Sequence, residues 1–355
     1  MMTFADTLIQ EIFLPPSRVT TEELIQKFIL PTKLSRYQTL QIPSSSQSSI
    51  SSKDDHPKSN SSLPLGIHWL QYQNNHEKSQ HKFRAIYFNH GFGASSLSWL
   101  PVIPKLADRL KANVGVAHDA CGFGFTDRPD KKHLETYSFA SNGDIAFSVL
   151  QQSLKESSDQ DTDGSGSGLI LMGHSMGAIA TLQMALKLPK ETPKWLVLVA
   201  PALGFHGSSL GSLSWFQRAK QQVGGLVWDV ASPFVRYILR RAVGSRNFWR
   251  KGLEAVWGDP SKLKDSDVLR FQWPSIGRGW EDGLVKFSRA QSKGPILSDR
   301  DAMERLLQAD SNATVTVILG RKDKVVPGKT VLSFLEPFRD KVKVYEMDGL
   351  GHDPF

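Results

Sequence analysis

The order of apolar and amphipathic segments constrains the fold of this chain more than any other feature. Short apolar runs typical of buried strands alternate with helical patterns from residue 83 to residue 199, and the alternation resumes at residue 314. Strands that alternate with helices predict an α/β fold with a mostly parallel, doubly wound sheet and helices on both faces. The expected strands are Phe83–Asn89, Val114–His118, Leu169–Met172, Trp195–Val199, Thr314–Leu319 and Val342–Glu346. The expected helices are Leu97–Leu110, Phe139–Leu154, Met176–Leu188 and Gly328–Phe338.

Between Leu203 and Leu297 the alternation stops. This segment has 15 Lys and Arg residues against 7 Asp and Glu residues, so its excess equals the net charge of +8 of the whole chain. It also holds six of the nine Trp residues. Its aromatic residues recur at helical intervals and no strand pattern is clear. We therefore expect an α/β core interrupted by a helical cap over residues 203–297.

The N-terminal region has a different composition. Residues Phe4 to Leu14 follow a helical spacing, whereas the stretch from Pro43 to Ser62 is mostly Ser and cannot bury a core. We expect three units along the chain. They are an N-terminal helical segment with a Ser-rich linker over residues 1–62, an α/β core over 63–202 and 298–355, and the cap over 203–297.

The cysteine content and the N-terminus bear on the compartment. A single cysteine, Cys121, cannot form an internal disulfide and fits a reducing compartment. No apolar run reaches the roughly 18 to 20 residues that a membrane helix needs, and Asp6 and Glu11 interrupt any signal-peptide pattern. We expect an intracellular, cytoplasmic protein without a transmembrane segment, a signal peptide or a nucleic-acid partner. The sequence leaves the oligomeric state open.

One short motif predicts a nucleophile. Residues 173–177, Gly-His-Ser-Met-Gly, match the pattern Gly-x-Ser-x-Gly, in which a serine occupies a sharp turn between a strand and a helix. The pattern alone is weakly specific, because a second match at residues 207–211 places Ser209 at its centre. Only the first match follows an apolar strand and precedes a helix-forming segment. Ser175 is therefore the predicted nucleophile, and Met176 follows it.

A serine nucleophile needs a base and an acid that orients the base. His206 and His352 are the histidines that follow Ser175, and only His352 follows a late strand in a Gly-rich turn. Asp323 comes after the strand expected at residues 314–319, where a carboxylate can orient the imidazole. Asp348 precedes His352 by four residues and reads as a solvated turn residue. We therefore predict His352 as the base and Asp323 as the acid.

The donors of an oxyanion hole can be placed in the same way. Such sites take one backbone N–H from the residue after the nucleophile and a second from the loop after an early strand. Residues 90–93, His-Gly-Phe-Gly, follow the strand expected at Phe83–Asn89. The predicted donors are Met176 and Phe92.

These segments, in this order and spacing, resemble the α/β-hydrolase superfamily and specifically its capped serine-hydrolase members, which are esterase- and lipase-like. The stretch Asp119–Pro129 is similar to the loop that these proteins carry after the fourth strand, with Thr126 where a Ser often stands. The resemblance covers about residues 64–355 and implies the α/β-hydrolase fold. Members that act as epoxide hydrolases or dehalogenases carry Asp at the elbow, so Ser175 points to acyl chemistry.

The resemblance implies a mechanism. Ser175 would attack an ester carbonyl, His352 would take its proton and Asp323 would stabilise the imidazolium, after which water would resolve the acyl-enzyme. We therefore expect a serine hydrolase, a carboxylic ester hydrolase acting on a mainly apolar small-molecule ester, with no metal or organic cofactor. Three alternatives stay open. They are an acyltransferase, a carbon–carbon bond hydrolase with the same triad, and a hydrolase-like receptor that binds a small molecule.

The composition of residues 203–297 suggests two further hypotheses. Its aromatic residues would build an apolar pocket above the nucleophile. Its basic residues would lie on the outer face, where they could hold the enzyme at an anionic membrane surface. The alternative is a cap whose aromatic residues form its own core and whose charges are solvated. The basic residues concerned are Arg236, Arg240, Arg241, Arg246, Arg250 and Lys251.

Overall fold

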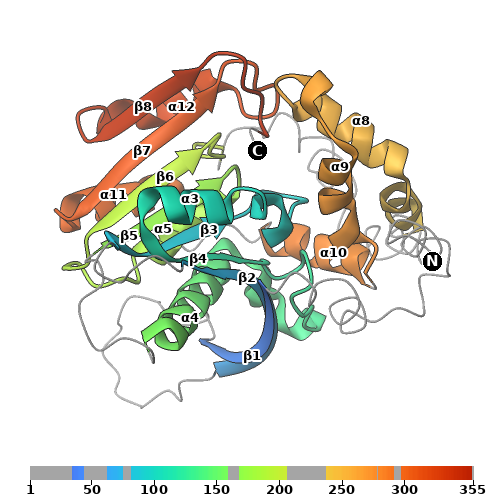
Figure 1. Cartoon of the computed structure of the whole chain (residues 1–355), viewed down its shortest axis with the longest axis horizontal. Helices are drawn as coiled ribbons and strands as arrows, with labels where there is room; N and C mark the ends of the chain where they lie inside the picture. Colours follow the sequence, from blue (N-terminus) through green and yellow to red (C-terminus); the bar gives the residue numbers. More distant parts are fainter. Residues whose placement is uncertain are drawn as a thin grey trace.

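One sheet of eight strands dominates the computed structural model, which describes residues 34–43, 62–74, 81–158, 168–205, 237–277, 279–291 and 297–353. The strand order is β1-β2-β4-β3-β5-β6-β7-β8 (Figure 1). β1 and β2 run antiparallel to their neighbours, and β3 to β8 are parallel to one another, so the predicted mostly parallel sheet is confirmed. The strands are β1 (Ser35–Pro43), β2 (Ser62–Gln73), β3 (Phe83–Asn89), β4 (Ala112–His118), β5 (Gly168–His174), β6 (Lys194–Val199), β7 (Ala313–Gly320) and β8 (Val342–Met347).

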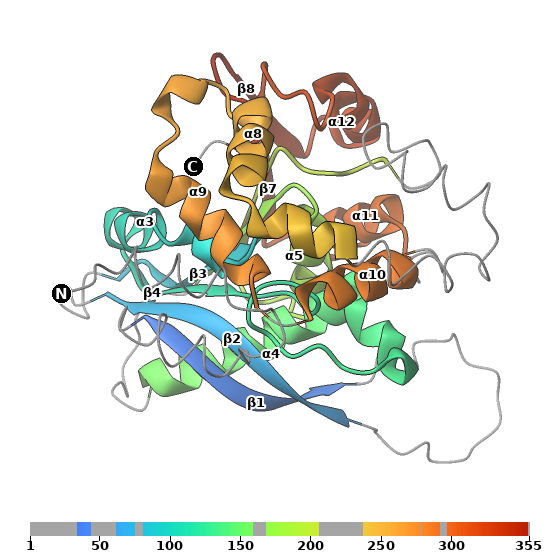
Figure 2. The ribbon, with the colours of Figure 1, turned by 90° about the vertical axis from the view of Figure 1, so that its right-hand side faces the viewer.

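The helices fall into two groups. One group packs on the sheet and consists of α3 (Ile103–Leu110), α4 (Phe139–Ser158), α5 (Gly177–Ala185), α11 (Asp299–Ala309) and α12 (Gly328–Leu335). The other follows β6 in the chain and consists of α8 (Arg246–Val256), α9 (Asp265–Gln272) and α10 (Trp280–Gln291). Figure 1 shows α8, α9 and α10 grouped beside one end of the sheet, and Figure 2 views them from that side. Short 3₁₀ helices span Ser96–Trp99, Lys131–Tyr137, Pro260–Lys262, Trp273–Ser275 and Glu336–Phe338.

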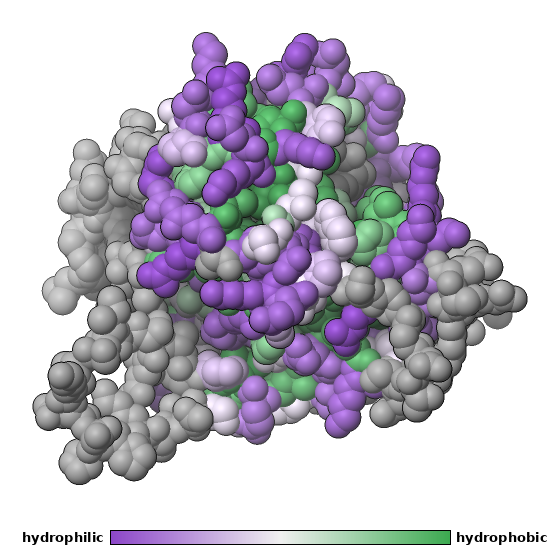
Figure 3. All heavy atoms as spheres, turned by 90° about the vertical axis from the view of Figure 1, so that its left-hand side faces the viewer, coloured by the Kyte–Doolittle hydropathy of each residue, from purple (hydrophilic) through white to green (hydrophobic). Residues whose placement is uncertain are grey.

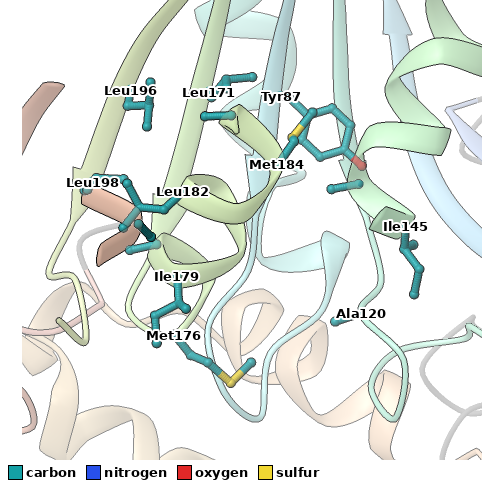
Figure 4. Close-up of a cluster of buried hydrophobic side chains, with 14 of the residues drawn as sticks. Tyr87, Ala120, Ile145, Leu171, Met176, Ile179, Leu182, Met184, Leu196 and Leu198 are labelled. Carbon is teal, nitrogen blue, oxygen red and sulfur yellow. The ribbon is translucent and has the colours of Figure 1, made fainter. Parts of the chain in front are cut away.

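Buried side chains cover the sheet on both faces. Along β3, Ala85 and Tyr87 belong to one buried cluster and Ile86 and Phe88 to another, because successive side chains of a strand point to opposite faces. The larger cluster also takes in residues of α4, α5, α11 and α12, and the smaller one residues of α3. In Figure 4 the apolar side chains of α5 lie beside the leucines of β5 and β6. The nucleophile motif therefore sits where a fully packed helix meets a fully packed strand.

The helix expected over Leu97–Leu110 is divided in the structure. A 3₁₀ helix covers Ser96–Trp99, and α3 begins only at Ile103. Pro101 has no N–H to donate and Pro104 stands in the first turn of α3, a position that proline tolerates. The two prolines therefore account for the break.

The expectation that the α/β core begins at residue 63 is wrong, because β1 is an edge strand of the sheet. β1 pairs with β2 along its whole length, from Ser35 opposite Leu70 to Pro43 opposite Ser62. Most of its side chains are exposed, so its sequence lacks the apolar pattern that reveals a strand. The predicted N-terminal helix and the interior of the Ser-rich linker lie outside the described residues.

The prediction that Arg240 lies on the outer face of the cap is also wrong. Its guanidinium donates to the carbonyls of residues 275–277 at 2.7 to 3.3 Å, where a 3₁₀ helix ends. Unpaired carbonyls at a helix end attract a cation, which explains this placement. Arg246 and Arg250 both pair with Asp265, and Arg246 does so at 3.0 Å. Asp265 therefore offsets one of these two positive charges, and the side chain of Arg246 stays 44% exposed.

The face of the molecule opposite α8 to α10 is mainly hydrophilic over the described residues, with smaller apolar areas between the polar ones (Figure 3). Among the helices in the described part of the chain, none combines the length and the apolar character that crossing a membrane requires.

Candidate active site

The predicted nucleophile lies in a sharp turn between β5 and α5. Ser175 has a φ of +52°, in the left-handed region that is unfavourable for a residue with a Cβ atom. Three backbone hydrogen bonds hold this turn. The Ser175 N–H donates to Val199 O at 2.9 Å, and the Ser175 carbonyl accepts from the N–H groups of Ala178 at 3.1 Å and Ala202 at 3.0 Å. The strained backbone is thus fixed by α5 and by the end of β6.

The two glycines of the motif are required by close approach. A Cβ atom on Gly173 would lie 2.4 Å from the hydroxyl oxygen of Thr181, and one on Gly177 would lie 2.3 Å from the carbonyl oxygen of Asn89. Both distances are far inside van der Waals contact. Glycine at these two positions therefore allows α5 to pack against β3 and β5 directly behind the serine.

The structure brings the three predicted triad residues together. His352 Nε2 is 3.0 Å from Ser175 Oγ, and His352 Nδ1 is 2.8 Å from Asp323 Oδ2. A carboxylate only accepts, so Nδ1 carries the proton and Nε2 is left to accept from the serine hydroxyl. Ser175 follows β5, Asp323 follows β7 and His352 follows β8, so the side chains meet at the carboxyl ends of parallel strands.

The carboxyl group of Asp323 is stabilised as an anion. Burial raises its pKa, but the hydrogen bond and charge of His352 and the N–H groups of Val325 and Val326 outweigh burial, so the pKa lies below its ordinary value of 3.8. Those two N–H groups donate to Oδ1 at 2.8 and 2.9 Å. Oδ2 remains for the imidazole, which fixes the tautomer of His352.

The residues that competed for these roles lie elsewhere. The side chain of Asp348 is 86% exposed and pairs with Arg321 at 2.9 Å, so it makes no contact with the imidazole of His352 in the hydrogen bonds of the described residues. His206 and Ser209 lie outside the described residues.

The two predicted oxyanion donors belong to segments that meet at the nucleophile, because Met176 follows Ser175 and a Cβ atom on Gly91, before Phe92, would lie 3.2 Å from Ser175 Cβ. Phe92 and Gly93 form the corner of a turn closed by a 3.3 Å hydrogen bond from the Ala94 N–H to Gly91 O, and Gly93 has a φ of +74°. Met176 is the residue that precedes α5. Among the hydrogen bonds of the described residues, neither the Phe92 N–H nor the Met176 N–H has a protein acceptor. Neither N–H is therefore committed to a hydrogen bond within that part of the protein.

A buried carboxylate, Asp119, holds the loop after β4. It accepts from the N–H groups of Ser96 at 2.6 Å and Phe125 at 2.7 Å and from His68 Nδ1 at 2.7 Å. Burial raises the pKa of Asp119, but His68 and the other donors hold it well below its usual range. Asp119 thereby ties the loop that carries Phe123 to the segment that follows the oxyanion turn.

Aromatic side chains gather around the oxyanion turn. The ring of Phe92, 41% exposed, lies 5.6 Å from Phe123 and 6.0 Å from Phe287 of α10, and Phe287 also lies 5.8 Å from Phe139. These four residues, which we call the aromatic cluster, place an apolar surface next to the predicted oxyanion donors.

The base loop, residues 348–353, is bound to the end of α8. The N–H groups of His352 and Asp353 both donate to Val256 O, at 2.8 and 3.3 Å, and Trp257 forms a parallel β-bridge with Asp353. The end of α8 thus contacts the backbone of the predicted base.

Two buried side chains next to the triad were not predicted from the sequence. Burial and the nearby His352 lower the pKa of His174 to about 3, and burial raises the pKa of Asp353 to about 6. His174 was visible as the variable residue of the motif, but its contact is with a residue 178 positions away. Within the described residues, no group of three or more His, Cys, Asp or Glu side chains is arranged to hold a metal ion.

Comparison with known proteins gives one family and many structural neighbours. A model described as the alpha/beta hydrolase family matches residues 86–355. No curated protein matches the chain in sequence. Identities as low as those of the solved structures establish a shared fold and leave the substrate open.

Three of the similar solved structures illustrate the range of activities on this fold. The 2-hydroxy-6-oxo-6-phenylhexa-2,4-dienoate hydrolase of Rhodococcus sp. strain RHA1 is 18% identical, with 90% of this chain and 93% of that chain covered and a TM-score of 0.53. A serine hydrolase involved in carbazole degradation is 16% identical, with 89% and 92% covered and a TM-score of 0.52. A bromoperoxidase from Bacillus anthracis is 14% identical, with 89% and 93% covered and a TM-score of 0.52.

Proposed function

The chain belongs to the alpha/beta hydrolase family, and on this premise we propose that it is a serine hydrolase that cleaves a carboxylic ester. The observation that supports the proposal most is the unbroken array from Asp323 through His352 to Ser175, with separations of 2.8 and 3.0 Å. The array ends on a serine in a strained turn, next to two backbone donors that have no protein acceptor among the described residues.

The proposed reaction proceeds in two halves. The oxygen of Ser175 bonds to the ester carbonyl carbon while its proton moves to His352 Nε2, and the N–H groups of Phe92 and Met176 bind the resulting oxyanion. The intermediate then expels the alcohol, which takes the proton from His352. Water, deprotonated by the same imidazole, attacks the acyl-enzyme, and the acid leaves as Ser175 regains its proton.

The proposed substrate is mainly apolar. The aromatic cluster sets Phe92 and Phe287 beside the oxyanion donors, and Phe92 is 41% exposed although its ring is large. Aromatic side chains that line a pocket with a few polar groups typically bind apolar ligands. An ester with an aliphatic or aryl acyl group fits this surface.

Labelling with a fluorophosphonate tests the nucleophile, because this probe forms a covalent bond with an activated serine. We expect Ser175→Ala to abolish both labelling and ester hydrolysis. Ser209→Ala, in the second motif, and Ser35→Ala should retain both, which makes them matched controls. Labelling of Ser175→Ala at the wild-type rate would contradict the assignment.

An ester panel separates the proposal from its alternatives. Turnover of p-nitrophenyl esters of graded acyl length in water alone supports a hydrolase. Turnover that needs an added alcohol indicates an acyltransferase, and turnover of a 2-hydroxy-6-oxo-2,4-dienoate without ester cleavage indicates a carbon–carbon bond hydrolase. Labelling of Ser175 with no turnover of any substrate indicates a receptor.

Contact with an anionic membrane stays a prediction. Of the basic residues that suggested it, Arg241 and Lys251 are exposed, Arg240 is internal, and Arg236 lies outside the described residues. Co-sedimentation with vesicles of anionic phospholipid at low and high salt checks it, because salt screens such attraction.

A further inference from the structure

The imidazole of His174 lies between the oxyanion turn and the base loop. It is 5% exposed, and its ring centroid is 4.9 Å from that of His352. A Cβ atom added to Gly91 would lie 2.9 Å from His174 Nδ1, so the ring packs directly against the backbone at the start of the oxyanion turn. On its other side, His174 Nε2 is 2.8 Å from the carbonyl oxygen of His352.

The direction of this hydrogen bond follows from its acceptor. A carbonyl oxygen cannot donate, so His174 Nε2 carries the proton and points it at the backbone of His352. Burial and the neighbouring His352 lower the pKa of His174 to about 3, which keeps the ring neutral at ordinary pH. A neutral ring can donate to the carbonyl without placing a second positive charge beside the imidazolium that forms on His352.

The peptide groups on the two sides of His352 are both occupied. The carbonyl accepts from His174, and the N–H donates to Val256 O at 2.8 Å. The side chain is held by Asp323 through Nδ1 at 2.8 Å. Asp323 sets the rotation of the ring, whereas His174 and Val256 set the position of the backbone from which the ring extends.

We infer that His174 is a positioning residue, which donates its Nε2–H to the carbonyl oxygen of His352 and so holds the base within reach of the Ser175 hydroxyl. This inference rests on the proposed function. The nucleophile motif therefore supplies two parts of the site, since Ser175 is the nucleophile and the residue before it fixes the base. A displacement of the base by about 1 Å can cost on the order of a hundredfold in rate.

Amide replacements at this position test the hydrogen bond. With p-nitrophenyl butyrate as the substrate, we expect His174→Leu to lower kcat by about 10- to 100-fold while KM changes by less than about threefold. His174→Gln, whose amide N–H can occupy the place of Nε2, should restore kcat to within about threefold of wild type. His174→Asn, which has the same amide on a shorter side chain, should not. Equal kcat values for the Gln and Asn variants would overturn the inference.

A double-mutant cycle distinguishes positioning from general destabilisation. If His174 acts through His352, His174→Leu should change the residual fluorophosphonate labelling rate of a His352→Ala protein by less than about twofold. An equal loss of labelling rate on His174→Leu substitution in the wild-type protein and in the His352→Ala protein would overturn the inference. His118→Leu, which removes a buried imidazole bonded to Tyr87 and Asn142, is the control and should lower thermal stability without lowering kcat.

The outcomes also separate this inference from the proposed function. A wild-type protein that takes no fluorophosphonate would refute the serine hydrolase. A wild-type protein that is labelled, and is slowed by His352→Ala but not by His174→Leu, would refute the positioning role alone.

Discussion

The same three side-chain types meet twice in the part of the chain that the structure describes, and the two arrays differ in their surroundings. Asp119 Oδ2 lies 2.7 Å from His68 Nδ1, and His68 Nε2 lies 2.7 Å from Ser35 Oγ, much like the array that ends on Ser175. Ser35 stands at the start of an edge strand, with no elbow turn and no helix directly after it. A strained turn and free backbone donors therefore mark the nucleophile better than Ser–His–Asp distances alone.

The acid can be tested at the same scale. Asp323→Asn keeps the shape of the side chain but removes the charge that stabilises the imidazolium, so we expect kcat to fall by about a thousandfold or more. Asp348→Asn is the matched control, because this carboxylate is 86% exposed and should alter kcat by less than about twofold. Steady-state kinetics of both variants on one ester measures the two kcat values. A larger loss for Asp348→Asn would mean that the acid is misassigned.

At the scale of elements, sequence patterns predicted β3 to β8 and missed β1 and β2. β3, β4 and β5 are almost entirely buried, so their apolar runs are strong, whereas β1 is mostly exposed and pairs with β2 across a Ser-rich stretch. β8, at the other edge of the sheet, is exposed along most of its length and was nevertheless predicted. Prediction of the active-site residues also depended on local patterns. Ser175, Asp323 and His352 each follow a recognisable strand, but the contact of His174 with His352 spans 178 positions and depends on how the loop after β8 reaches the end of β5. No local pattern records such a contact.

The junction between α8 and the base loop gives an element-scale prediction. A Cβ atom on Gly258 would lie 2.2 Å from Gly349 O and 2.4 Å from Gly351 N, so the two backbones are in direct contact. Gly258→Ala should push the base loop away and lower kcat by about 10-fold or more, measured on the same ester. Gly252→Ala within α8 is the control. Its Cβ meets nothing within 4 Å, so this change should leave kcat unaltered and stabilise the helix by up to about 1 kcal/mol. Equal kcat values for the two variants would show that α8 does not support the base.

At the scale of the whole molecule, several buried titratable side chains lie near the carboxyl ends of the strands, among them His118, His174 and Asp353. Burial lowers the pKa of His118 to about 4 and that of His174 to about 3. The two histidines therefore make the folded state less stable as the pH falls, because their imidazoles take up protons in the unfolded chain at a higher pH than in the folded protein. Asp353 has the opposite tendency, so the stability of the wild-type protein alone cannot isolate its contribution.

A comparison of the free energies of unfolding of Asp353→Asn and the wild type isolates the contribution of Asp353. Burial raises the pKa of Asp353 from 3.8 to about 6, so the folded protein holds a proton between about pH 4 and 6 that the unfolded chain has lost. The protonated carboxyl group therefore stabilises the folded state of the wild type fully below about pH 4, and this stabilisation is lost as the pH rises to about 6. Asn imitates the protonated form at every pH. The variant should therefore gain stability relative to wild type across that interval, reaching roughly 3 kcal/mol above pH 6. Urea unfolding at pH 4 and pH 7.5 measures the two differences, with Asp348→Asn as the exposed control. A difference that is the same at both pH values would mean that folding does not raise the pKa of Asp353.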